Sequence, residues 1–330
     1  MVVNYIKVRL ARYKYFCVGW DGPVRGIIAL VHQNKSPVGI WLLAIRPKTL
    51  PAAAAPVIVG AMLAFREVKF RLIPALVCLI AALLLQIGSN LANDVFDFEK
   101  GSDSGERLGP TRVTQAGLLM PSQVKRGMLI VFGLTSLCGV YLIFQGGWPI
   151  LALGVAAILS AIAYTGGPYP LGYHGLGDLF VFIFFGLGAT VGTYYVQMLK
   201  ASFTIWCMAA AMGLLTVNIL VVNNLRDLEN DRRVGKKTLA VRLGENGARI
   251  EYLICLLFAL TIPVVLWAFG KISFWPLILI VLIPQGAQLV RTLYEQTGQA
   301  LNKTLAATGR FELFYAIFFS LGILLERFFS

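Results

Sequence analysis

Long apolar runs without charge dominate the chain and set its predicted elements. Residues 127–177 carry no charge, and the turn sequence Gly-Gly-Trp-Pro divides this run into two spans. A weaker run covers residues 311–329. Six further charge-free windows each approach the ~20 residues that a helix needs to cross a bilayer: 49–65, 72–93, 179–199, 201–225, 252–270 and 272–290. The pattern therefore predicts nine membrane spans.

These runs do not alternate between apolar and polar residues, as the strands of a membrane barrel would. Lipid admits only helices or closed barrels, so the prediction is an all-α, polytopic helical bundle. The first span begins near Val38, and Pro47, Pro51 and Pro56 predict that its helix is bent or broken. We expect a basic N-terminal extension at residues 1–35 and a single transmembrane domain at residues 36–330.

Composition agrees with a membrane protein and gives its orientation. The chain is 58% hydrophobic and only 14% charged, against about 25% charge in an average soluble protein. With nine spans, 23 of the 29 Lys and Arg residues fall on one side, which the positive-inside rule makes cytoplasmic. The net charge of +13 is thereby explained by topology, and we do not expect nucleic-acid binding.

An acidic cluster follows directly on the uncharged run 72–93. Asp94, Asp97 and Asp103 lie there, preceded by Asn90 and Asn93. In a helix, steps of three and four residues would place Asn90, Asp94 and Asp97 on one face. Grouped carboxylates repel one another, so this arrangement predicts a cation that neutralises them.

A second cluster follows the uncharged run 201–225 in the same way. Asn223, Asp227 and Asp231 step by four residues, and Lys236 and Lys237 come shortly after them. Hard carboxylate and amide oxygens suit Mg²⁺, which usually keeps a substrate phosphate among its ligands. Two such clusters at one membrane surface predict a metal-bridged diphosphate.

Two other segments on the same side carry candidate binding residues. The loop 98–124 holds Arg107 and Arg112, whose planar donors suit phosphate, although solvated surface charges would look the same. The segment 164–178 is rich in glycine and holds Tyr164, Tyr169 and Tyr173. These tyrosines could cover a flat aromatic substrate, or they could mark the membrane interface.

At this point the chain resembles a known family. The segments NDVFDFEKGSD and RDLENDRRVGKKTLAVRLG resemble the two aspartate motifs of the UbiA superfamily of intramembrane aromatic prenyltransferases. The segments AIRPKTLPAAAAPVIVG and YTGGPYPLGYHGLGDLFVFIFFG resemble its 1,4-dihydroxy-2-naphthoate polyprenyltransferase branch. Five residues separate Asp97 from Asp103, where the hydroxybenzoate branch commonly has three, and no Lys-Arg pair follows Tyr164 soon. Both departures favour the naphthoate.

The resemblance implies nine helices around a central cavity open to lipid, with Mg²⁺ and diphosphate at the cytoplasmic mouth. It implies prenyl transfer from polyprenyl diphosphate to 1,4-dihydroxy-2-naphthoate, with loss of CO₂ and diphosphate, to give a demethylmenaquinol. The catalytic acids would be Asp94, Asp97, Asp227 and Asp231. The implied metal ligands are these four acids with Asp103, Asn90, Asn93 and Asn223. The expected diphosphate ligands are Arg107, Arg112 and Lys237, and the expected aromatic-substrate ligands are Lys48, Tyr164 and Tyr169.

Two alternatives stay open. Another aromatic prenyltransferase of the same superfamily, making a different quinone or a chlorophyll, would carry similar motifs. An ion-coupled transporter would place carboxylates near mid-membrane in broken helices, whereas these acids lie at the ends of spans. We expect an integral protein of a bacterial inner membrane, in contact with lipid, with its active site facing the cytoplasm.

Overall fold

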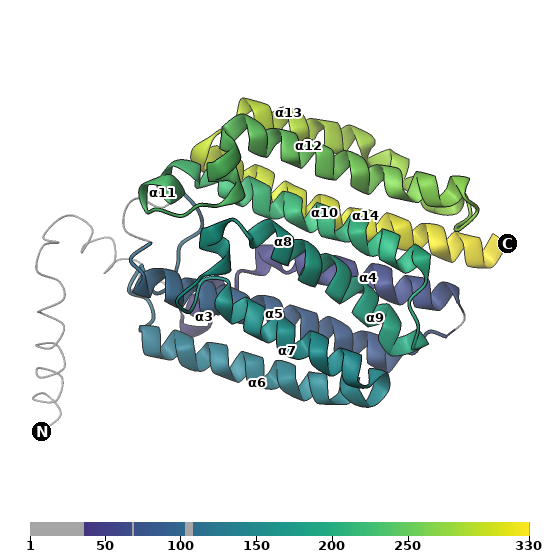
Figure 1. Cartoon of the computed structure of the whole chain (residues 1–330), viewed down its shortest axis with the longest axis horizontal. Coiled ribbons are helices and arrows are strands. Elements are labelled where there is room, and N and C mark those ends of the chain that lie inside the picture. The colour runs from purple at the N-terminus through teal and green to yellow at the C-terminus, as the bar shows by residue number, and fades with distance from the viewer. Residues whose placement is uncertain (1–35, 68, 103–107, 330) are drawn as a thin grey trace, which may run out of the picture.

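A computed structural model describes residues 36–67, 69–102 and 108–329, and its regular structure there is entirely helical (Figure 1). The helices run roughly parallel, so their connections gather at the two ends of the bundle. This confirms the prediction of an all-α fold. In chain order the elements are α3 (Pro37–Ile45), η1 (Pro47–Thr49), α4 (Pro51–Arg66), α5 (Leu72–Glu99), α6 (Pro121–Gly146), α7 (Trp148–Ala163), η2 (Leu171–His174), α8 (Gly177–Val181), η3 (Phe182–Gly188), α9 (Ala189–Met198), α10 (Phe203–Arg226), α11 (Leu228–Arg233), α12 (Leu239–Ala268), η4 (Trp275–Leu282), α13 (Ile283–Glu295), η5 (Gly298–Ala300) and α14 (Leu301–Phe329).

The described residues hold six helices that are long and apolar enough to cross a membrane, or seven if the bent N-terminal pair is one span. That pair, Pro37–Thr49 and Pro51–Arg66, bends by 51° where the prolines predicted a break. Helix α7 is apolar but has only 16 residues, which is short for a span. The count of nine spans is therefore not confirmed, although the chain is an integral membrane protein.

Helix α10 lies at the centre of the bundle. Some 67% of its most apolar window is buried, against 22% for the peripheral helix α6. The π-helical η3 reaches α10 closely, because a Cβ on Gly186 would come within 2.4 Å of the Gly213 Cα atom. Large apolar side chains face outward instead on the periphery, such as Phe144 and Trp148, as contact with lipid requires.

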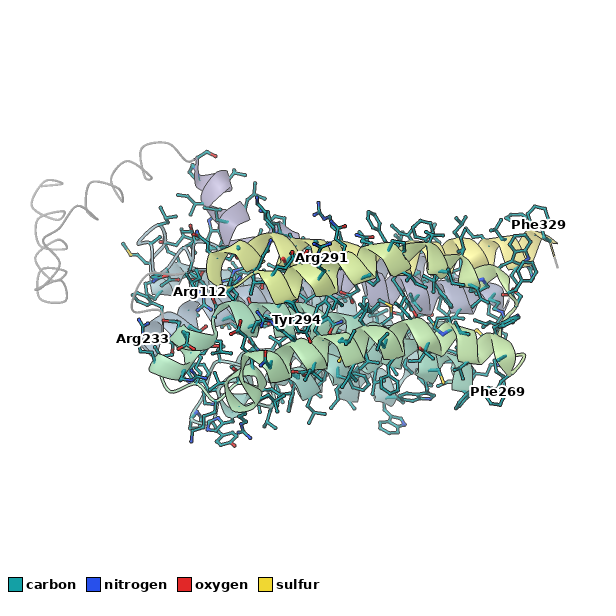
Figure 2. The ribbon with its side chains drawn as sticks, turned by 90° about the horizontal axis from the view of Figure 1, so that it is seen from above. Arg112, Arg233, Phe269, Arg291, Tyr294 and Phe329 are labelled. Carbon is teal, nitrogen blue, oxygen red and sulfur yellow. The ribbon has the colours of Figure 1, made fainter. Side chains whose placement is uncertain are left out.

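The two ends of the bundle differ in chemistry. Arg112 and Arg233 lie at one end, while Phe269 and Phe329 lie at the other (Figure 2). Both predicted acidic clusters belong to the arginine end, because α5 and α10 finish there. The connections at this end carry the candidate chemistry, and the bundle beneath them supplies an apolar interior.

Candidate active site

A cavity of about 300 Å³ opens among α5, α7, α10 and the segments at the arginine end. Its inner wall is small or apolar and includes Ala82, Ala157, Phe180, Phe184 and Leu220. Its mouth is polar, and the polar lining residues include Arg46, Thr49, Gln86, Asn90, Asn93, Asp97, Arg112, Tyr164, Thr165, Tyr173, Asn223, Asn224, Asp227, Asp231 and Lys236. A ligand with a charged head and an apolar tail fits this division.

In the first acid cluster, which is Asp94 and Asp97 on α5, the Asp97 side chain is only 2% exposed. An Arg112 nitrogen lies 2.5 Å from one of its oxygens, and the Tyr173 hydroxyl donates a 2.6 Å hydrogen bond to the other. Lys236 Nζ lies 3.5 Å from that second oxygen. Asp97 is thus surrounded by donors from three segments far apart in the sequence.

Asp94 has a different environment, although it lies only three residues earlier. It is buried and does not line the cavity. Its two oxygens accept hydrogen bonds from the backbone N–H groups of Val113 and Thr114, each at 3.0 Å. The expected common face is therefore only partly observed, because Asn90 and Asp97 line the cavity while Asp94 faces the loop.

The second acid cluster is Asp227 and Asp231, at the junction of α10 and α11. Arg226 donates to both oxygens of Asp227, at 2.9 and 2.5 Å, and also to Asn223 and to Asn302 of α14. Asp231 lies 3.9 Å from Lys236 Nζ. Burial raises the pKa of Asp231 to about 6, and Lys236 counteracts part of that rise.

The amides of α5 hold the neighbouring backbone. Asn90 donates to the Ile45 carbonyl and to the Thr49 hydroxyl, which fixes the bend between α3 and α4 against α5. Asn93 accepts from the Thr165 hydroxyl and so ties α5 to the tyrosine segment. Both asparagines also line the cavity.

The tyrosine segment forms part of the cavity wall. Tyr164 packs against two glycines, since a Cβ on Gly172 or Gly177 would come within 2.9 or 2.7 Å of its side chain. Tyr173 donates to Asp97 and contacts Ser102, and its ring lies 4.6 Å from Lys236 Nζ. Burial and the Asp97 charge raise the pKa of Tyr173 well above its usual value, so it stays protonated and donates.

Several predicted residues lie away from the cavity. Lys48 and Lys237 have exposed side chains and do not line it. Tyr169 is 58% exposed and stacks on His174 instead. Asp103 and Arg107 lie outside the described residues, as does the extension 1–35.

The predicted ligand sets lacked several polar lining residues, among them Arg46, Thr49, Gln86 and Lys236. One sequence signal for Gln86 exists, because it is a polar residue inside an apolar run, four positions before Asn90. Thr49 has no comparable signal, since only the bend between α3 and α4 brings it to α5. The sequence does not distinguish Lys236 from its equally basic neighbour Lys237, and only the structure shows that Lys236 lines the cavity.

The donor set suits Mg²⁺. Asp97, Asp227 and Asp231 contribute carboxylate oxygens to the cavity, and Asn93 and Asn223 contribute amide groups. Among the described residues no three His, Cys, Asp or Glu side chains are already grouped as a metal site. The carboxylates here are paired with Arg112, Arg226 and Lys236. A bound metal ion would compete with these basic side chains for the carboxylate oxygens.

The structure is a polytopic helical bundle with an acid-lined cavity at one end. This arrangement is typical of an intramembrane enzyme that acts on a charged, lipid-like substrate. The UbiA prenyltransferase family model matches residues 53–324, and the chain belongs to this family. It is 39% identical to the 1,4-dihydroxy-2-naphthoate octaprenyltransferase of Escherichia coli, over 90% of this chain and 99% of that protein. The protein of the same description from Bacillus subtilis is 29% identical, over 88% of this chain and 93% of its own length.

Solved structures share the fold. A UbiA homologue from Archaeoglobus fulgidus, bound to DMAPP and Mg²⁺, gives a TM-score of 0.64 at 13% identity, covering 86% of this chain and 99% of that one. A UbiA homologue from Aeropyrum pernix gives a TM-score of 0.60 at 16% identity, covering 84% and 98%. The helical architecture is thus that of the UbiA fold.

Proposed function

We propose that this prenyltransferase transfers a polyprenyl group from polyprenyl diphosphate to 1,4-dihydroxy-2-naphthoate, with loss of CO₂ and diphosphate. The product is a demethylmenaquinol, an intermediate of menaquinone biosynthesis. The observation that supports this proposal most directly is the cavity. Its mouth combines three aspartates with Arg46, Arg112 and Lys236, and its interior is apolar. The relatives named above, which are described as acting on this naphthoate, support the choice of acceptor.

The mouth of the cavity would bind the diphosphate. Asp97, Asp227 and Asp231, with Asp103, would hold Mg²⁺, which supplies charge stabilisation for the leaving diphosphate. Arg112 and Lys236 already reach Asp97, so they can turn toward diphosphate oxygens that arrive beside it. Arg46 lines the same wall and adds a third cation. Positive groups fixed in a poorly hydrated site stabilise the charge that develops on the departing oxygen.

The interior would hold the reacting carbon atoms. As the carbon–oxygen bond to diphosphate breaks, its electron pair leaves with the diphosphate and the allylic carbon becomes cationic. The electron-rich naphthalene ring then supplies a pair from the carbon that bears the carboxylate and forms the new carbon–carbon bond. Breaking the bond to CO₂ returns a pair to the ring and restores aromaticity. The apolar wall at Phe180 and Phe184 excludes water that would trap the cation.

The arginine end would face the cytoplasm of a bacterial inner membrane. This assignment rests on the bias of basic residues toward that side. We expect a cysteine replacing Gly235 to react with a membrane-impermeant maleimide only from the cytoplasmic side, and one replacing Lys271 only from the other. Labelling of Gly235→Cys from outside would reverse the assignment.

The reaction is tested with purified protein in lipid nanodiscs. Carboxyl-labelled 1,4-dihydroxy-2-naphthoate and a polyprenyl diphosphate should give unlabelled prenylated product and one labelled CO₂ per turnover, only with Mg²⁺ present. Asp231→Asn is the inactive control, and 4-hydroxybenzoate is the comparison acceptor. Retention of the label in the product would refute decarboxylation. Efficient prenylation of 4-hydroxybenzoate alone would overturn the acceptor.

A further inference from the structure

Asp94 is a buried carboxylate that the proposed chemistry does not use directly. Its side chain is 1% exposed, both of its oxygens accept backbone N–H groups, from Val113 and Thr114, and an Arg46 nitrogen lies 4.0 Å from one of them. Ionised acceptors make the stronger class of hydrogen bond, and burial strengthens them further. Asp94 therefore fastens the 108–119 segment to α5 at two adjacent residues.

The fastened segment has little structure of its own. It contains turns and no helix, and the described backbone bonds within it are few, such as those from Leu118 and Ala116 back to Val113 and Arg112. Val113 is fully buried. Apart from the bond that Asn302 donates to the Leu108 carbonyl, the position of this segment depends on contacts with α5, among them the pair at Asp94.

The residue immediately before the fastened pair is Arg112. Its guanidinium bonds to the Asn93 carbonyl at 3.0 Å and lies 2.5 Å from an Asp97 oxygen. Asp94 and Asp97 belong to the same helical turn, so one turn of α5 holds both the backbone and the charged end of this arginine. Fixing the Val113 amide fixes the starting point of the Arg112 side chain.

We propose that Asp94 is a positioning residue, which clamps the 108–119 segment so that Arg112 points into the cavity. The identity of the anion that Arg112 meets there rests on the proposed function, but the clamp does not. Asp94 does not line the cavity, so service as a metal ligand would require this part of α5 to turn and would leave two buried N–H groups without their acceptor. This separates Asp94 from Asp97, with which the sequence pattern had grouped it.

Trypsin cleavage after Arg112 measures the clamp without any substrate. In the intact protein this bond is protected, because Arg112 is buried. Asp94→Asn keeps the shape but turns one acceptor into a donor, so cleavage should become about tenfold faster. Asp231→Asn is the matched control, since it also removes one buried carboxylate at this end yet touches neither Val113 nor Thr114. Equal cleavage of Asp94→Asn and the intact chain would overturn the proposal.

Hydrogen exchange tests the clamp in the unaltered chain and covers the case that Asp94→Asn does not fold. Peptides that contain Val113 and Thr114 should exchange slowly, at rates like those of the ends of α5. Exchange at the rate of an open loop would contradict the clamp.

Enzyme kinetics then separate a clamp from a ligand. For Asp94→Asn we expect a raised KM for the prenyl diphosphate, with the Mg²⁺ concentration for half-maximal rate unchanged. The double variant Asp94→Asn, Arg112→Gln should be no worse than Arg112→Gln alone, because the clamp acts on the cavity through the Arg112 side chain. A protected segment with a raised Mg²⁺ requirement would instead make Asp94 a ligand. If no variant or substrate combination gives turnover but cleavage behaves as stated, the proposed function fails and the clamp stands.

Discussion

The two acid clusters have similar sequences but obtain their counter-charges in different ways. Asp97 is contacted by Arg112, Tyr173 and Lys236, which come from three separate segments. Asp227 is contacted by Arg226, its own neighbour in the chain. The first cluster is assembled by loops, whereas the second is built into the end of a helix.

Because of this difference, we expect substitution of the arginine to affect mainly activity in the first cluster and mainly stability in the second. The Arg226 side chain is 1% exposed and is held by several partners, so it is part of the folded core. Arg112 is also buried, but it is carried by an irregular segment that lies outside the helices of the bundle. Similar substitutions in the two clusters should therefore give different losses.

The largest effect is expected for the acid of the first cluster. Asp97→Asn should lower kcat by about 1000-fold, because it removes a metal ligand and leaves two cations facing one another. The variant should still insert and fold, and a single monodisperse peak on gel filtration in detergent would check this. A loss of less than about tenfold would place the metal elsewhere.

The next effect should differ between the two arginines. Arg226→Gln should lower the free energy of unfolding by about 3 kcal/mol, because it breaks a buried pair. Arg112→Gln should lower kcat/KM by about 100-fold with a much smaller change in stability. Thermal melts and steady-state kinetics on both variants test this. Equal melting temperatures would remove the distinction between the clusters.

A smaller effect is expected where the clusters meet. A Cβ on Gly109 would lie 2.7 Å from an Arg226 nitrogen, so Gly109→Ala must displace the guanidinium or the loop. We expect a loss of kcat/KM of about tenfold. Gly139→Ala in α6 is the matched control, because nothing lies within 4 Å of its Cβ position. An unaffected Gly109→Ala would show that the two clusters are independent.

The smallest effect is a change in pH dependence. Burial holds the pKa of Asp231 at about 6, above its ordinary value of 3.8, so its ionised fraction falls as pH drops through about 6. Binding of Mg²⁺ to the metal-free protein, which needs this carboxylate ionised, should weaken on the same limb. Lys236 lowers this pKa, and Lys236→Met should move the limb to higher pH. A limb that does not move would assign it to another group.

The sequence predicted much of the fold for a simple physical reason. Membrane helices are long apolar runs, and both acid clusters directly follow such runs, so their common end could be inferred. The bend between α3 and α4 also followed from its prolines. The span count could not be fixed, because α7 is short and the length of a run alone does not decide crossing.

The site was less predictable because side-chain direction depends on distant contacts. Helical spacing grouped Asp94 with Asp97, yet Asp94 bonds to the amides of a loop 19 and 20 residues away and does not line the cavity. Likewise Lys236 and Lys237 are adjacent and equally basic, but only Lys236 reaches Asp97. No periodicity in the sequence contains this information.

Asn302, in the first turn of α14, gives the molecule a route for energetic communication. It accepts from Arg226 at 3.0 Å and donates to the Leu108 carbonyl at 2.7 Å, so it joins the second cluster to the loop that carries Arg112. A ligand that orders the loop also restrains the second cluster through Asn302, so a ligand that binds there next loses less conformational entropy. The prenyl diphosphate and the metal should consequently bind with positive cooperativity, and Asn302→Ala should reduce the coupling while leaving each isolated affinity nearly unchanged.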